Sequence, residues 1–97
     1  MSTFIILANY TEQGIANVKQ SPKRLDAARE LAKSMGATLK DFYLCMGVYD
    51  MAVIVEAPND EAVAKLALAL GSAGNVRTTT IRAFAEPEYR KIIGALP

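Results

Sequence analysis

The chain has 97 residues, which is enough for one domain with a modest hydrophobic core, and we expect a single domain over residues 1–97. Eleven basic and ten acidic residues leave a formal net charge of +1, so the composition predicts neither nucleic acid nor a membrane as a partner. The chain contains no histidine. This excludes His-dependent catalytic triads, imidazole-ligated haem and most transition-metal sites, and we expect no metal and no cofactor.

The single cysteine and the start of the chain indicate the cellular compartment of the protein. Cys45 has no second cysteine with which to form an intramolecular disulfide, which fits a reducing, cytoplasmic compartment. Met1–Thr3 lacks the positive charge that opens a signal peptide, and the apolar run Phe4–Ala8 is far too short to span a bilayer. Hydrophobic residues make up 52% of the chain, slightly more than in a typical soluble monomer. The excess indicates apolar surface buried between subunits, and we expect a cytoplasmic homo-oligomer.

The first part of the chain predicts a strand followed by a helix. Phe4–Ala8 is a continuous apolar run, typical of a strand buried on both faces, and Thr11–Gly14 predicts a turn or the start of a short irregular helix. Ser21 as N-cap and Pro22 at the first helical position predict a helix that ends at Gly36. The apolar stripe of this helix recurs at spacings of three and four residues: Leu25, Ala28, Leu31, Ala32 and Met35.

The middle of the chain predicts a hairpin. Thr38–Met46 is mixed in polarity, as an edge strand tends to be, and Met51–Val55 is an apolar run that suits a strand buried on both faces. The turn between them, Gly47–Asp50, is short enough to join antiparallel strands. We expect Gly47 to take a positive φ and Asp50 to bond back to amides of the turn.

The last part of the chain predicts a helix, a fourth strand and a terminal helix. Pro58–Asp60 ends the third strand and offers an N-cap for a helix over Asp60–Ser72. That helix is apolar almost all round, which indicates that a partner chain or the C-terminal segment covers a second side, although alanine is also simply a good helix former. Asn75–Phe84 then predicts a strand, and Glu88–Leu96 predicts a short helix.

The order of the main elements is βαββαβ. Each βαβ crossover should be right-handed, and the ferredoxin-like form of an α+β fold satisfies this rule with a four-stranded antiparallel sheet in the order 4-1-3-2 and two helices. This order places the strands at Phe4–Ala8 and Met51–Val55 in the middle of the sheet. They are the two most apolar strands of the chain, which independently supports the arrangement.

Several stretches resemble the GYD domain family. The turn Gly47-Val48-Tyr49-Asp50 resembles the signature of that family. Three further groups also match its pattern: Thr11 with Gly14, Glu56-Ala57-Pro58, and Asn75-Val76-Arg77-Thr78 with Thr80. The resemblance covers nearly the whole chain, and it implies a fold rather than an activity.

The chain is more distantly similar to the ligand-sensing domain of the leucine-responsive transcription regulators. The shared features are the Gly47–Asp50 turn, the buried strand after it, the Pro58–Asp60 cap and the stretch Asn75–Thr78. Both groups belong to the dimeric α+β barrels, in which two sheets pack face to face across a dimer axis. The resemblance therefore implies a dimeric α+β barrel. The chain has no helix-turn-helix of its own, so a DNA-binding role would need another chain.

Four residues are candidates for a ligand-binding site: Tyr43, Tyr49, Asp50 and Glu56. Tyr43 and Tyr49 could donate phenol hydrogen bonds to a ligand, or they could be core or interface aromatics whose hydroxyl groups reach water. No residue is assigned a catalytic role.

The two candidate carboxylates lie at opposite ends of the third strand. A regular strand would separate Asp50 and Glu56 by about 20 Å, too far for both to act on one substrate atom. The structural interpretation of Asp50 is a turn residue, and that of Glu56 is an exposed carboxylate or a partner of Arg77 or Arg82. In an apolar cleft, the pKa of Glu56 would rise and its carboxylate could act as a base.

Three hypotheses for function remain open. The first is a homo-oligomeric barrel that binds a small organic ligand or acts as an interaction module. The second is a cofactor-independent enzyme of the monooxygenase or isomerase type, with Tyr, Asp or Glu as acid and base in a cleft between sheet and helices, by analogy of fold. The third is a purely structural oligomeriser. An enclosed polar cleft would favour the first two, and a cleft filled by side chains would favour the third.

Overall fold

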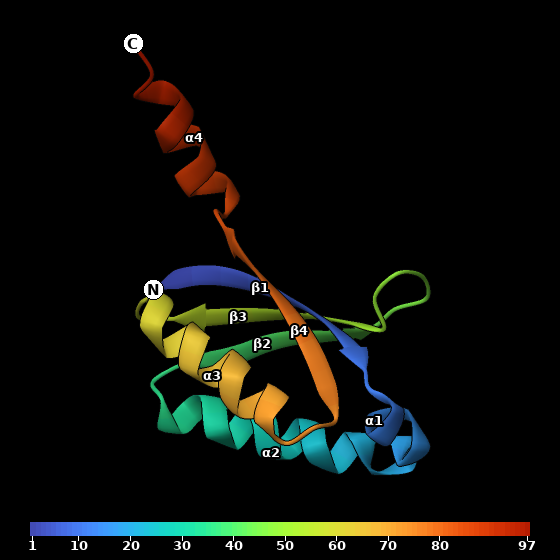
Figure 1. Cartoon of the computed structure of the whole chain (residues 1–97). Helices are drawn as coiled ribbons and strands as arrows, with labels where there is room; N and C mark the ends of the chain where they lie inside the picture. Colours follow the sequence, from blue (N-terminus) through green and yellow to red (C-terminus); the bar gives the residue numbers. More distant parts are fainter.

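The computed structural model describes residues 1–97, and its main elements follow the predicted order (Figure 1). Their bounds are β1 (Ser2–Tyr10), α1 (Glu12–Ala16), α2 (Ser21–Ser34), β2 (Thr38–Leu44), β3 (Met51–Ala57), α3 (Asp60–Ser72), β4 (Val76–Ala83) and α4 (Glu86–Gly94). The strands form one antiparallel sheet in the order β2-β3-β1-β4. The ferredoxin-like prediction is therefore confirmed, together with the central place of the two most apolar strands.

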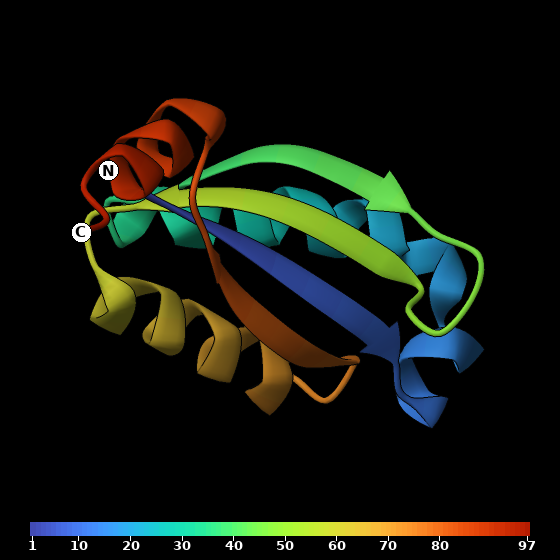
Figure 2. The same cartoon turned by 90° about the horizontal axis from the view of Figure 1, so that it is seen from above.

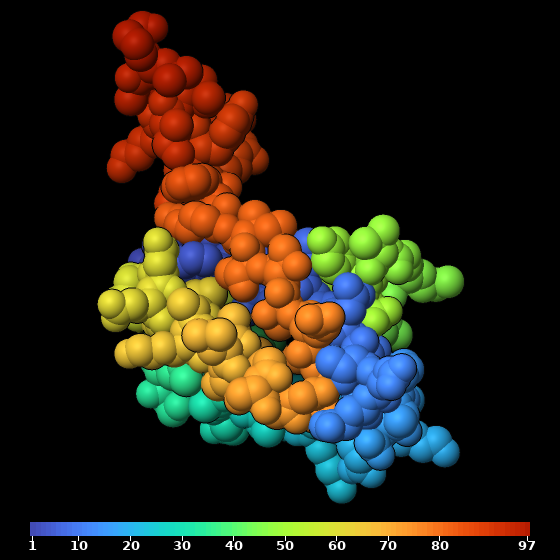
Figure 3. All heavy atoms as spheres, viewed as in Figure 1, coloured from blue at the N-terminus to red at the C-terminus, as the bar shows by residue number.

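The helices are unevenly distributed around the sheet. Helices α2 and α3 lie side by side on one face (Figure 2), whereas α4 projects from the end of β4 and stands clear of the body (Figure 3). The sequence predicts that the terminal helix begins at Glu88. Helix α4 begins two residues earlier, at Glu86, because Pro87 fits the first turn of a helix. The molecule is elongated, with principal extents of 52 × 31 × 18 Å. None of the helices combines the length and the apolar character that a bilayer crossing requires.

The hydrophobic core lies between the sheet and helices α2 and α3. Successive residues of a strand point to opposite faces, so every second residue of β1 turns toward the helices. Phe4, Ile6 and Ala8 are these residues, and all are buried. Val55 of β3 and Leu66 of α3 belong to the same cluster as Phe4 and Ile6, and both are 0% exposed. The core therefore joins the central strands to the longer helices.

The opposite face of the sheet carries apolar side chains and no helix. Ile5 of β1 lies between Ile54 of β3 and Ile81 of β4, and Leu7 lies opposite Ala52. Ile81 is 43% exposed, and Ile5 and Leu7 are half-buried. The prediction that the first strand is buried on both faces is thus confirmed for one face within a single chain. On the other face no helix of this chain covers the strand, so its burial there stays a prediction that depends on a partner chain.

The helix ends follow the predicted signals, with one exception. The side-chain oxygen of Asn59 caps α3 by accepting a hydrogen bond from a first-turn amide at 2.9 Å, and Gly36 takes a φ of 76° after α2. Ser21 is not the N-cap of α2. A 3₁₀ turn over Val18–Gln20 runs directly into the helix, which makes Ser21 its first residue. The Ser21 hydroxyl is instead hydrogen-bonded to the hydroxyl of Tyr10 at 3.0 Å.

Helix α1 is held closely against the connection between α3 and β4. A Cβ atom added to Gly14 would lie 1.9 Å from the carbonyl oxygen of Asn75, so only glycine allows this approach. The amide of Thr11 donates to the same carbonyl oxygen at 3.1 Å, and the Thr11 hydroxyl donates to the carbonyl oxygen of Gly74. The Nε2 group of Gln13 donates to Oδ1 of Asn75 at 3.0 Å. These contacts join the end of β1 to the start of β4.

The burial of Leu66 predicts the effect of a charge in the core. Leu66→Asp would place an unpaired carboxylate among apolar side chains, at a cost of several kcal/mol, which is a large share of the stability of a small domain. We expect the variant to be insoluble or unfolded when expressed. The matched control is Leu68→Asp on the same helix, because Leu68 is 74% exposed. Soluble Leu66→Asp protein with an unchanged melting temperature would contradict this account of the core.

The close contact between α1 and the Asn75 backbone predicts opposite changes in stability for two glycine substitutions. Gly14→Ala must push α1 away from the Asn75 backbone, and we expect it to lower the free energy of unfolding by about 1–3 kcal/mol. Gly71 lies within α3, and a Cβ atom there would meet no atom within 4 Å. Gly71→Ala should therefore raise the stability by up to about 1 kcal/mol, since alanine is the better helix former. Urea unfolding measures both, and equal stabilities for the two variants would refute the tight contact.

Candidate functional site

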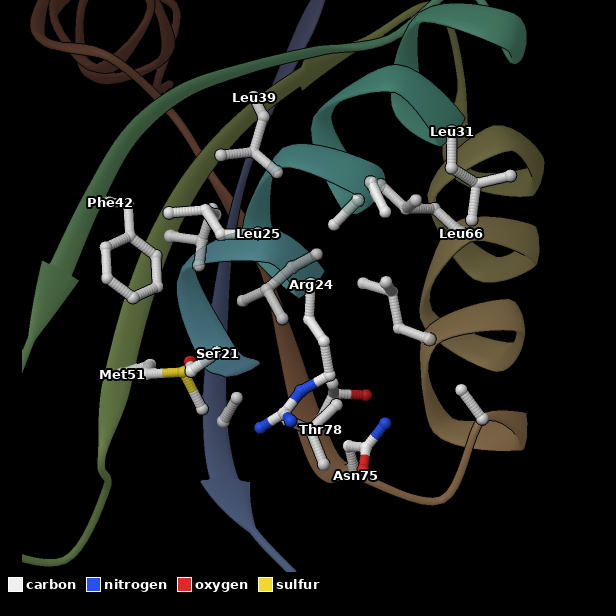
Figure 4. A pocket seen from close by; sticks show the side chains of 18 of the residues that line it. Ser21, Arg24, Leu25, Leu31, Leu39, Phe42, Met51, Leu66, Asn75 and Thr78 are labelled. Atoms are coloured by element: carbon white, nitrogen blue, oxygen red, sulfur yellow. The ribbon is translucent and has the colours of Figure 1, made fainter. Parts of the chain in front are cut away.

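A cavity of about 290 Å³ lies between the sheet and helices α2 and α3 (Figure 4). Of its 20 lining residues 16 are hydrophobic, so the space suits an apolar molecule. Several lining positions on the strand and on both helices hold alanine, among them Ala8, Ala28 and Ala69. A larger side chain at any of them would fill part of the space. The cavity therefore follows from small residues on the inner surfaces of β1, α2 and α3.

One end of the cavity is polar. Tyr10, Ser21, Arg24, Asn75 and Thr78 line it, and the labelled polar side chains Arg24, Thr78 and Asn75 gather in one part of the view in Figure 4. The Tyr10 and Ser21 hydroxyl groups are hydrogen-bonded to each other, as described above. The strand register supports the same grouping, because Thr78 lies opposite the residue two before Tyr10. The polar end of the cavity thus lies where β1 ends and β4 begins.

The Arg24 guanidinium is held by backbone carbonyl groups. Its Nη1 donates to the carbonyl oxygen of Asn17 at 2.9 Å, and its Nη2 donates to that of Gly14 at 3.2 Å. Gly14 also touches Asn75, so Arg24 and Asn75 share a neighbour. Arg24 is half-buried and is the one charged residue in the lining, which contains no carboxylate. The polar end therefore carries a positive charge.

None of the four candidate residues from the sequence lines this cavity. Tyr43 lies on the edge strand β2 opposite Ala52, on the outer face of the sheet, and is 57% exposed. Tyr49 is half-buried in the loop between β2 and β3, and its hydroxyl makes no hydrogen bond. Gly47 in the same loop has a φ of 141°, so the predicted positive φ is confirmed. The tyrosine candidates are thus placed away from the cavity.

Asp50 ties the hairpin loop to the end of β1. Its Oδ2 accepts a hydrogen bond from the amide of Tyr10 at 2.9 Å. Its own amide donates to the carbonyl oxygen of Ala8 at 2.9 Å and to Oδ1 of Asn9 at 3.1 Å. The predicted bonds to turn amides are therefore wrong in detail, because the amide that Asp50 binds belongs to the neighbouring strand. Asp50 also lines a second, more open hollow, together with Tyr10 and Leu44.

Glu56 lies at the opposite end of β3. It pairs with Lys40 of the edge strand β2 at 3.0 Å, so the predicted pairing with Arg77 or Arg82 is wrong. The sheet order explains this outcome: β3 has β2 and β1 as neighbours, whereas both arginines lie on β4, beyond β1. The hydrogen bond and the charge of Glu56 raise the pKa of the Lys40 ammonium above its usual value. Asp50 and Glu56 are not brought together, since they lie beside opposite ends of β1.

The residues that line the polar end were absent from the candidates drawn from the sequence. Arg24 lies in the first turn of α2, where a charged side chain usually faces solvent. Its spacing carried a signal, because Arg24, Ala28 and Leu31 are separated by four and three residues and so share the face that packs on the sheet. For Asn75 the signal was its place in the family pattern. Neither signal indicates a cavity without the arrangement of the helices.

Comparison with known proteins agrees with this architecture. The sequence model of the GYD domain matches residues 4–93. A Thermus thermophilus protein named "Glutamine synthetase and cystathionine beta-lyase binding protein" is 34% identical over 84 residues, which cover 86% of this chain and 88% of that protein.

Two solved structures share the fold. The crystal structure of MtbAldR matches with a TM-score of 0.68 at 16% identity, over 88% of this chain and 52% of that one, so the chain spans about half its length. That of TTHA0845 from Thermus thermophilus matches with a TM-score of 0.57 at 22% identity, over 88% of this chain and 95% of that one. These two likenesses agree with the fold described above. The match of the family model over nearly all of the sequence confirms the resemblance seen in the sequence motifs: the chain belongs to the GYD domain family.

Proposed function

We propose that the chain is a homo-oligomeric binding module that takes up a small organic molecule in the cavity between the sheet and helices α2 and α3. The observation that carries this proposal is the cavity itself, which is apolar over most of its wall and polar at one end. Ligand sites commonly combine an apolar wall with a few convergent polar groups, and the volume of about 290 Å³ lies near the lower end of their usual range.

The homo-oligomer is supported by the outer face of the sheet. Ile5, Leu7, Ile54 and Ile81 form a continuous apolar surface there, because the register places them beside one another. Contiguous apolar surface of this kind is unfavourable in water and is usually covered by a partner. A second copy of the sheet, packed face to face at about 10 Å, would cover it and would form the dimeric α+β barrel that the resemblance implies.

A second candidate function is the binding of other proteins. The relative from Thermus thermophilus is named for binding two enzymes, glutamine synthetase and cystathionine beta-lyase. The observation in this chain that favours such a role is the tip of the hairpin, where Leu44 at the end of β2 and Met46 and Val48 in the loop after it are all exposed. Three exposed apolar side chains at one loop tip offer a surface on which a partner protein could pack.

The other two hypotheses receive less support. An acid–base enzyme would need a carboxylate or a comparable group in the cleft, and Tyr10 is the one acid–base candidate in a lining that holds no Asp or Glu. A purely structural oligomeriser would fill the space between sheet and helices with side chains. The open volume favours ligand binding over both.

The apolar outer face predicts the oligomeric state. We expect light scattering after size exclusion to give at least twice the chain mass at micromolar concentration. Ile54→Lys should yield a folded monomer, because it places a charge in the interface and leaves the core on the other face intact. Leu68→Lys is the control, since Leu68 is exposed on α3 and faces away from the sheet; it should keep the oligomer. A monomeric wild-type protein at that concentration would contradict the proposed barrel.

The cavity predicts a retained ligand. Native mass spectrometry of protein purified from its own host should show a species heavier than the apo oligomer by the mass of a small molecule. Ala69→Leu would fill part of the cavity and should lose this extra mass while it keeps the oligomer. Ala64→Leu is the matched control on the same helix, because Ala64 is exposed and does not line the cavity. Equal retention by Ala69→Leu and wild type would place the ligand elsewhere.

A further inference from the structure

We propose that the ligand of this cavity is a small monocarboxylate with an apolar chain or ring, bound with its carboxylate at the Arg24 end. The inference rests on the proposed function, because it assigns the chemical class of the molecule in the same cavity. Three features of the site support it: an arginine without an acidic partner, neutral donors beside it, and an apolar wall of limited volume.

The first feature is the charge of Arg24. No carboxylate of the chain forms an ion pair with it, although it is half-buried at the cavity wall. A guanidinium has five N–H donors, and the bonds to Asn17 and Gly14 use two of them. The group is therefore held in position and keeps donors for a ligand. Since guanidinium donors match the two oxygens of a carboxylate, an anionic head group fits this end.

The second feature is the set of neutral donors at the same end. Oδ1 of Asn75 is taken by Gln13, which leaves the Nδ2 group of Asn75 without a partner in the chain. The Thr78 hydroxyl also lines the cavity without a hydrogen bond. Both groups can donate to an acceptor, and their side chains appear in the same part of the cavity as Arg24 (Figure 4). A carboxylate offers acceptor sites enough for all three residues.

The absence of an acidic residue from the cavity lining narrows the chemical class of the ligand further. A free amino acid would bring its ammonium into a site whose lining holds a cation and no carboxylate. An apolar amine would meet the same positive charge directly. Burial of an ammonium without an anionic partner is strongly unfavourable, so both classes are disfavoured relative to a simple carboxylate.

The third feature is the size of the apolar part. Leu31, Leu39, Phe42 and Leu66 line it, and nothing polar interrupts that wall. If each non-hydrogen atom of a ligand occupies about the 30 Å³ of one water molecule, a volume of about 290 Å³ holds about ten such atoms. Octanoate has this size. Each methylene group placed in the cavity should raise the affinity about fourfold, until the space is full.

The test compares ligands that differ only in head group or only in chain length. Isothermal titration calorimetry on the intact oligomer would use octanoate, octan-1-ol, octylamine and butanoate. We expect octanoate to bind about 10-fold to 100-fold more tightly than octan-1-ol, as for a charge-assisted hydrogen bond. Butanoate should bind more weakly than octanoate by the loss of four methylene groups, and octylamine should bind most weakly among the eight-carbon compounds. This series needs no variant and so does not depend on the folding of one.

A pair of variants then tests the role of Arg24. Arg24→Gln should lose at least about tenfold in octanoate affinity and leave octan-1-ol unchanged, because only the carboxylate uses the charge. Lys23→Gln removes the neighbouring exposed charge and should change neither affinity. Thermal unfolding of both variants reports whether the loss of the bonds to Asn17 and Gly14 disturbs the fold.

The possible outcomes separate the two proposals. Equal affinities for octanoate and octan-1-ol, or an octanoate affinity that a folded Arg24→Gln variant retains, would overturn the carboxylate assignment and leave ligand binding in the cavity standing. Tighter binding of octylamine would overturn it in the same way. Failure of all four compounds to bind would count against the cavity as a ligand site, and therefore against the proposed function itself.

Discussion

The close approach of α1 to the connection between α3 and β4 is the constraint on which the polar end of the cavity depends. Gly14 has no side chain, so α1 can lie directly on the backbone of Asn75, whose carbonyl oxygen also accepts the amide of Thr11. Gly14 of this short helix and Asn17, which caps its end, offer the carbonyl groups that hold Arg24. One backbone contact thus positions both a cation and a neighbouring amide. A displaced α1 would move the two together, away from the cavity wall.

The cavity and the hydrophobic core occupy the same layer, and they make opposite demands on it. In the core, Val55 and Ala57 pack without accessible surface. Along the cavity, Ala28 and Ala69 leave space that larger residues would fill. An unfilled apolar space forgoes dispersion contacts and lowers the stability of the empty protein. A molecule that occupies it supplies those contacts and stabilises the folded state by mass action. In the proposed binding module, the alanines would therefore exchange stability of the empty protein for the capacity to bind.

The fold was predictable from the sequence because its signals are local. Apolar runs, helical spacing and the Asn59 cap each lie within one element, and the order of elements then restricts the topology. The site was less predictable. Asp50 and Glu56 drew interest as carboxylates near a motif, yet they bind a strand amide and Lys40. Arg24 and Ala69 form the cavity only because two helices, distant in sequence, present particular faces to each other, and periodicity does not determine that rotation.

The two faces of β1 have an energetic consequence. Ile6 borders the cavity, while its neighbours Ile5 and Leu7 belong to the uncovered face. In the proposed barrel, a single strand backbone would therefore separate the ligand from the partner subunit. Occupation of the cavity that straightens or twists this strand must change the shape that the second sheet meets. Thermodynamic linkage then makes the effect reciprocal. If ligand binding changes the association constant of the subunits by some factor, association changes the ligand affinity by the same factor. Where the ligand strengthens association, dilution would weaken both equilibria together, and the concentration of the protein would itself regulate how much ligand it carries.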